Sequence, residues 1–274
     1  MAHPVQNPVH TVVLGALRLY LSQLIPPTAA HGDTTMTDII ELKATDLAAM
    51  LCSRVCHDLI NPIGAIGNGL EVLADPAQSE MAEGARDLIA SAAKQSRAKL
   101  EFARLAYGAS STSGTDIDTR ECERVARILF EIEKADLDWQ VPLILLPKHK
   151  AKLFMNMLLI AAGSVPRGGL VTAKISGPAG EEKFEFTSKS DPEKRQKTLV
   201  PSGSAGLLSG MPEEGSVDAR GIQPFYTGLL ARMTDMEVSI GLENDMFFFN
   251  ATPKPALASE PADAEPAEAV PASE

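Results

Sequence analysis

A histidine and an aspartate stand side by side near the start of the stretch CHDLINPIGAI, residues 56–66. The imidazole of His57 can serve as a nucleophile near neutral pH, because part of a histidine population is then uncharged. The carboxylate of Asp58 can orient the ring or act as a base toward it. This pair predicts nucleophilic or acid–base chemistry at His57.

The pair belongs to a predicted helix that runs from about 43 to 74. Its apolar side chains are spaced 4, 3, 4 and 3 residues apart, as one helix face requires: Leu59, Ile63, Ile66, Leu70 and Leu73. The Asp75-Pro76 dipeptide ends the helix, because the residue before a proline avoids helical dihedral angles. At about 100° per residue, His57 lies roughly 200° from this seam and should face solvent.

The face that carries His57 is polar and small rather than rich in Glu and Lys. Arg54 precedes the histidine by about one turn, and Asn61 and Gly64 follow it. Small residues allow another protein to approach the imidazole, and Pro62 leaves one backbone carbonyl without its helical hydrogen bond. A lone exposed histidine on a helix often has no function, but these neighbours together argue against that alternative.

A second long helix is predicted from about 78 to 107. Its seam has the same alternation of spacings and consists of Ile89, Ala93, Ser96, Leu100, Ala103 and Tyr107. Two such helices joined by a short turn form an antiparallel hairpin, whose core is small on its own. Two copies of the hairpin would close a four-helix bundle, so we expect a homodimer.

The pattern changes after a small polar linker, residues 108–114. The expected elements are a strand at 141–146, a helix at 150–162, strands at 170–176 and 183–188, a helix from Pro224 to about Met236, and a hairpin at 237–241 and 245–250. This order predicts an α+β layer. The expected domains are a flexible extension at 1–38, the hairpin at 39–110, the α+β domain at 111–251 and a disordered Pro/Ala/Glu tail at 252–274.

Bulk composition narrows the classes of function. A net charge of -11 argues against a general nucleic-acid binder, because such proteins neutralise phosphates with Lys and Arg. Three cysteines do not form a disulfide framework, which favours reduced thiols and a cytoplasmic protein. No run of about 18 apolar residues occurs, so no membrane span is expected.

The run from His57 to Pro62 resembles the phosphoacceptor box of two-component histidine kinases. The wider stretch SRVCHDLINPIGAIGNGLEVL, residues 53–73, is similar to the ChpT-type histidine phosphotransferases of bacterial cell-cycle phosphorelays. The resemblance covers roughly residues 40–250. It implies a homodimer with a helical-hairpin bundle, followed by a degenerate ATPase-like α/β sandwich of the histidine-kinase kind.

The resemblance also implies a role for His57 and supporting roles for several residues in and beside the box. His57 would take a phosphoryl group from the receiver domain of a CckA-type hybrid histidine kinase and pass it to CtrA-type and CpdR-type response regulators. Asp58 would orient the ring or act as a base, with Arg54, Asn61, Pro62 and Gly64 in support. No cofactor is expected in this chain, and the Mg²⁺ that phosphoryl transfer uses would come from the receiver.

Two other functions stay open at this point. The first is an atypical ATP-dependent histidine kinase, whose nucleotide motif normally has two asparagines four residues apart. Asn156 fits the first position, but Ile160 stands at the second and no Asp-x-Gly-x-Gly motif follows. Because Ile cannot ligate a hard cation, ATP binding is not expected. The second is a non-catalytic dimeric adaptor, in which His57 would be replaceable.

Overall fold

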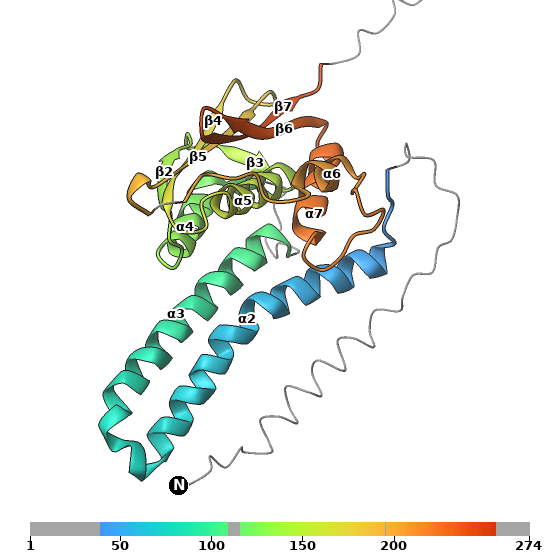
Figure 1. Cartoon of the computed structure of the whole chain (residues 1–274). Coiled ribbons are helices and arrows are strands. Elements are labelled where there is room, and N and C mark those ends of the chain that lie inside the picture. The colour runs from blue at the N-terminus through green and yellow to red at the C-terminus, as the bar shows by residue number, and fades with distance from the viewer. Residues whose placement is uncertain (1–38, 109–115, 195, 256–274) are drawn as a thin grey trace, which may run out of the picture.

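The computed structural model describes residues 39–108, 116–194 and 196–255. The expectations for the N-terminal extension, for most of the linker and for nearly all of the tail therefore lie outside the described residues. Within them, a long helical hairpin projects from a compact region built on a sheet (Figure 1). No helix in the described ranges has the length and apolar content needed to cross a bilayer.

The hairpin consists of α2, Ala44–Ala74, and α3, Ala82–Ala106, joined by the 3-10 helix η1, Pro76–Met81. The predicted end of the first helix is confirmed. Asp75 stops α2, and its carboxylate accepts a hydrogen bond from the backbone N–H of Ala77 at 2.9 Å. The second helix begins later than predicted, because the residues after Pro76 form the tighter turns of η1.

Small residues let α2 and α3 pack closely. A Cβ on Gly69 would meet Cγ1 of Ile89 at 2.6 Å, so only glycine fits there without a shift. The predicted seam of the second helix is only partly correct. Ala93 and Leu100 are exposed, and the buried side chains of α3 are Ala85, Ala92, Ala98, Phe102, Leu105 and Ala106.

Helix α2 contains Pro62 near its middle and remains helical through it. In Figure 1 this helix changes direction along its length. Proline bends a helix because its ring displaces the preceding turn and one backbone hydrogen bond is lost. Pro62 is buried, so the bend is packed against the rest of the hairpin rather than against solvent.

The second region is a five-stranded mixed sheet with helices on one face. The sheet has the order β2-β4-β5-β7-β6, with β2 parallel to β4 and the other pairs antiparallel. Its strands are β2 Asp136–Gln140, β4 Gly169–Ser176, β5 Lys183–Ser190, β6 Met236–Glu243 and β7 Met246–Pro253. A separate pair consists of β1 Asp116–Asp118 and β3 Leu145–Pro147. The helices are α4 Thr119–Phe130, α5 Lys148–Gly163, α6 Ser204–Ser209 and α7 Ile222–Met233.

Alternating strand residues build the core of this region. Phe184 and Phe186 point from β5 toward α5, where Phe154 lies 5.2 Å and 4.8 Å from them between ring centroids. Phe247 and Phe249 of β7 are completely buried on the same side. The predicted strands at 170–176 and 183–188, the helix at 150–162 and the final hairpin are confirmed.

The prediction of one strand at 141–146 was wrong, because only its last two residues enter a strand, β3. Pro142 interrupts the apolar run and lacks the N–H that a ladder needs. The segments α4 and β2 were not predicted. Five of the twelve residues of α4, TRECERVARILF, are charged and lie outside its buried face. That buried face is formed by Thr119, Cys122, Val125, Ala126, Leu129 and Phe130.

A buried asparagine joins the hairpin to the sheet region. The side-chain amide of Asn156 on α5 donates to the carbonyl of Ala106 at 3.1 Å and to that of Lys152 at 2.9 Å. Ala106 ends α3, where backbone carbonyls have no partner within the helix. At the same end of the hairpin, Leu47 and Leu51 at the start of α2 pack against Ile222 and Phe225 of α7.

We predict that Asn156→Ala lowers the free energy of unfolding by about 1–3 kcal/mol, because it leaves the Ala106 carbonyl buried without this donor. Urea denaturation followed by circular dichroism measures the change. Asn68→Ala, at an exposed position of α2, is the matched control and should not destabilise the chain. Equal stability of Asn156→Ala and the wild type would contradict the role given to this side chain.

Candidate active site

The ring of His57 projects from α2 into solvent, as predicted. Its side chain is 76% exposed. Nδ1 lies 3.4 Å from Oδ1 of Asp58, which turns Nε2 away from the carboxylate. Because an ionised carboxylate only accepts hydrogen bonds, this arrangement favours the tautomer with the proton on Nδ1. The lone pair is then on the outward nitrogen, Nε2.

Asp58 is held on its other side by an arginine one turn earlier. Nε of Arg54 donates to Oδ2 of Asp58 at 3.0 Å, and the two side chains are 24% and 29% exposed. The backbone carbonyl of Asp58 accepts a third contact, from Nζ of Lys99 on α3 at 3.1 Å. The structure therefore brings Arg54, His57 and Asp58 together and adds Lys99 to them.

The remaining predicted residues lie around this group without bonding to it. Asn61 is exposed, and no hydrogen bond of its side chain occurs within the described part of the chain. Gly64 is also exposed, and a Cβ there would meet no atom within 4 Å. Nothing in the folded chain itself thus requires glycine at this position, which leaves room for a partner. Pro62 faces the opposite way and is buried.

Behind Asp58 lies a small cavity of about 110 Å³ between the hairpin and the sheet region. Its polar lining includes Arg54, Asp58, Lys99, Tyr107 and Glu133. Glu133 as a whole stays exposed, but partial desolvation of its carboxyl raises the pKa, which Lys99 opposes and Asp58 increases. Burial also places the pKa of Tyr107 well above its ordinary value of 10, and the Tyr107 hydroxyl has no hydrogen-bond partner among the described residues.

Sequence reasoning missed Lys99 and Glu133. Lys99 lies 41 residues from Asp58, and its partner depends on the register in which α2 and α3 pack. Glu133 follows α4, a helix that was not predicted. The one sequence signal for the Lys99 contact was Pro62, which predicted a backbone carbonyl without its helical donor but not which residue would bond to it.

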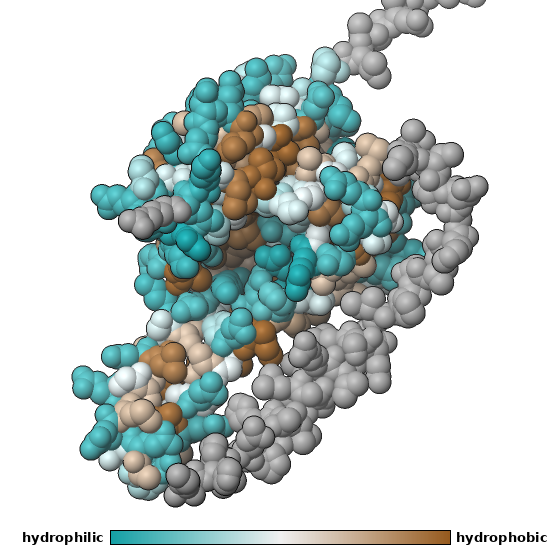
Figure 2. Space-filling model, in the orientation of Figure 1, coloured by the Kyte–Doolittle hydropathy of each residue, from teal (hydrophilic) through white to brown (hydrophobic). Residues whose placement is uncertain are grey.

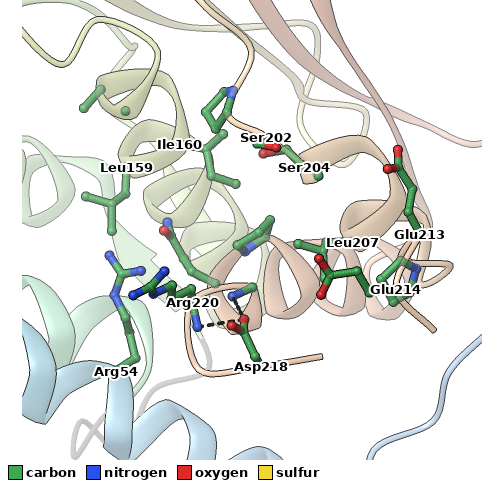
Figure 3. Close-up of a pocket in the computed structure, with 18 of the residues that line it drawn as sticks. Arg54, Leu159, Ile160, Ser202, Ser204, Leu207, Glu213, Glu214, Asp218 and Arg220 are labelled. Carbon is green, nitrogen blue, oxygen red and sulfur yellow. Dashed lines mark hydrogen bonds between the residues drawn. The ribbon is translucent and has the colours of Figure 1, made fainter. Parts of the chain in front are cut away.

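A larger cavity of about 720 Å³ opens beside the same arginine (Figure 3). Arg54 and Arg220 point into it from one side, and Leu207, Glu213 and Glu214 lie across from them. Asp218 accepts hydrogen bonds from the backbone N–H groups of Arg220 at 3.0 Å and Gly221 at 2.6 Å. The ionisable lining comprises Glu133, Glu213, Glu214 and Asp218 against Arg54 and Arg220, so acidic groups predominate.

The glycine-rich stretch 202–206 leads into a short helix, because Ser204, Ala205 and Gly206 form the first turn of α6. Ser202 and Ser204 line the larger cavity, as does Ile160 from α5 (Figure 3). Within the described ranges, no group of three or more His, Cys, Asp or Glu side chains is arranged to hold a metal ion.

Comparisons with known proteins agree over most of the chain. The family model described as histidine phosphotransferase C-terminal domain matches residues 119–245. The protein phosphotransferase ChpT of Brucella abortus (strain 2308) is 41% identical over 212 residues, which are 77% of this chain and 98% of that protein. A solved 1.7 Å structure of a bacterial phosphotransferase is 42% identical with a TM-score of 0.70, over 78% of this chain and 98% of that chain.

We predict that Tyr107 stays protonated in the folded chain at pH values where an ordinary tyrosine ionises. A raised pKa stabilises the folded state below the unfolded pKa, so stability is lost as pH rises above about 10. Phenolate absorbance of the wild type minus that of Tyr107→Phe should be near zero before unfolding and should show one extra phenolate afterwards. An extra phenolate in the folded wild type near pH 10, where an ordinary tyrosine ionises, would contradict this burial.

Proposed function

Because this chain belongs to the ChpT-type histidine phosphotransferases, we propose that His57 is the residue that carries the phosphoryl group. The chain is a histidine phosphotransferase of a phosphorelay. The observation that supports His57 is its geometry: an exposed ring whose Nδ1 faces a carboxylate and whose Nε2 faces outward. Among the described residues, His149 is the other histidine, and it lies exposed on α5 without a carboxylate hydrogen bond.

The proposed reaction begins with a receiver domain that carries a phosphorylated aspartate. The lone pair of His57 Nε2 forms the N–P bond while the P–O bond to the aspartate breaks, and the carboxylate of the receiver leaves. The ring then carries positive charge, which Asp58 stabilises through Nδ1–H. The reverse exchange on a second receiver returns the ring to its neutral form.

The supporting residues act mainly through Asp58. Arg54 holds the carboxylate by its Nε, which keeps Oδ1 directed at the ring. Asp58 is thereby engaged on both oxygens and is poorly placed to ligate a metal ion. We propose that the Mg²⁺ of the reaction is held by the receiver domain. Asn61 and Gly64 lie on the exposed face beside His57, where a receiver would dock.

The exposed apolar face of the hairpin supports a homodimer. Ile63 and Leu70 of α2 are each 54% exposed and lie one heptad apart, and Leu100 of α3 is 50% exposed. Apolar side chains are visible on the projecting hairpin in Figure 2. A second hairpin would cover this face and complete a four-helix bundle, as most of the stability of such helices comes from buried apolar faces.

We propose that the sheet region is a degenerate ATPase-like domain that does not use ATP. Asn156, which stands at the first asparagine position of the nucleotide motif, is completely buried and donates its amide to backbone carbonyls. Ile160, at the second position, puts a hydrocarbon side chain on the cavity wall. The predominantly acidic lining also repels the phosphates of a nucleotide.

The partners proposed from the family are a CckA-type hybrid kinase receiver as donor and CtrA-type and CpdR-type regulators as acceptors, in a cell-cycle phosphorelay. We further propose a cytoplasmic location, where such regulators act. The cysteines are consistent with reducing conditions: Cys52 and Cys56 are exposed and unpaired, and Cys122 is buried and unpaired.

We predict that wild-type protein takes label from the ³²P-phosphorylated receiver domain of a CckA-type kinase and that His57→Ala takes none. His149→Ala is the matched control, because it removes an exposed helical histidine outside the site and should be labelled like the wild type. Labelling of His57→Ala would place the carrier at another residue. Labelling of the wild type by ATP alone would instead indicate an autonomous kinase.

We predict that Ile63→Asp combined with Leu70→Asp converts the protein from a dimer to a monomer, because two carboxylates would be buried without partners in the bundle. Light scattering after size exclusion measures the mass against the 29.2 kDa of one chain. The control is Leu143→Asp, a substitution at a 71% exposed leucine of the sheet region, which should remain dimeric. A monomeric wild type would refute the bundle.

A further inference from the structure

Pro62 creates a specific defect beside the phosphoacceptor. In an α-helix the N–H of residue 62 donates to the carbonyl of residue 58, and proline has no N–H. The carbonyl left without its helical donor is therefore that of Asp58, the residue next to His57. A carbonyl freed in this way can tilt away from the helix axis and take another donor.

Lys99 supplies that donor from the neighbouring helix. Its Nζ lies 3.1 Å from the carbonyl oxygen of Asp58, although the two residues are 41 apart in the chain. Lys99 is only partly exposed and lines the small cavity behind Asp58. A charged donor on a backbone carbonyl is stronger than the neutral bond that it replaces.

The contact from Lys99 completes the fixation of Asp58. The carboxylate is held at Oδ2 by Arg54 and faces Nδ1 of His57 with Oδ1, while the backbone of the same residue is held by Lys99. Arg54 lies on α2 itself and cannot fix this helix relative to α3. Lys99 is the group that ties the bent segment of α2 to its partner helix at the level of the reacting ring.

We propose that Lys99 is a positioning residue for phosphoryl transfer: by occupying the Asp58 carbonyl that Pro62 frees, it fixes the Asp58 carboxylate against Nδ1 of His57. This inference rests on the proposed role of His57 and deepens it. Lys99 lies behind Asp58 and bonds its backbone, so it acts on the imidazole only through this residue. Its loss should lower the rate of the chemical step rather than the affinity for the receiver.

The test compares single-turnover transfer from a phosphorylated receiver domain to wild type, Lys99→Met and Lys94→Met. We expect Lys99→Met to lower the maximal rate by about 10-fold or more, because small displacements of reacting groups are costly, and to leave the half-saturating receiver concentration unchanged. Lys94→Met makes the same charge change on α3, where Lys94 pairs with Glu131 at 2.8 Å on the surface, and should transfer like the wild type.

A second background separates positioning from general stability. Pro62→Ala restores an N–H that can donate to the Asp58 carbonyl, so the loss caused by Lys99→Met should shrink when both substitutions are present. A loss of the same size in both backgrounds would overturn the inference. If Lys99→Met proves too unstable to assay, Lys99→Gln takes its place in the same comparison.

The outcomes also distinguish this inference from the function on which it rests. A wild type that takes no label at His57 refutes the proposed function and the inference together. A labelled wild type and a Lys99→Met variant with equal maximal rates refute the inference alone. A reduced maximal rate with unchanged half-saturation, diminished in the Pro62→Ala background, supports it.

Discussion

One helix, α2, has to present three different surfaces, and the packing of α2 on α3 divides them. The buried side carries Pro62 and Gly69. Because Gly69 has no side chain, α3 can approach α2 closely at this point. An apolar side with Ile63 remains exposed, and the polar side carries His57. Since a helix advances about 100° per residue, the spacing of these residues fixes which of the three sides of α2 each one lies on. The Asp58 carbonyl, which Pro62 leaves without its helical donor, therefore bonds to Lys99 rather than to solvent.

The sheet region holds the hairpin at the end nearest the site. Asn156 binds the last turn of α3. The ring of Tyr107, the next residue after α3, lies 5.9 Å from that of Tyr226 on α7 in a tilted arrangement. These contacts bring Glu133 close behind Asp58, where partial desolvation raises the pKa of the Glu133 carboxyl against the opposing effect of Lys99. The sheet region thus contributes by packing against the hairpin and by placing charged groups behind Asp58, next to the proposed phosphoacceptor His57.

Local patterns in the sequence were sufficient for the hairpin, the exposure of His57 and most of the sheet. They failed where the deciding contact lies far along the chain. Ala93 and Leu100 have the spacing of a buried seam, yet they are exposed. The way α3 packs in the folded chain buries Ala92 and Phe102 instead. Pro142 split an apolar run that read as one strand. The Lys99 contact requires that same register, so no spacing within α2 or α3 alone could have shown it.

The order of elements along the chain affects how the molecule is made. The hairpin ends at Ala106, before the first residue of the five-stranded sheet, Asp136, is synthesised. Its internal contacts are comparatively local, so it can form early on the ribosome, whereas the sheet must wait for β7 near the end of the chain. During that interval Ile63, Leu70 and Leu100 are exposed on a nascent chain. Neighbouring ribosomes on one messenger RNA would hold such hairpins close together, so the proposed homodimer could pair before either sheet is complete.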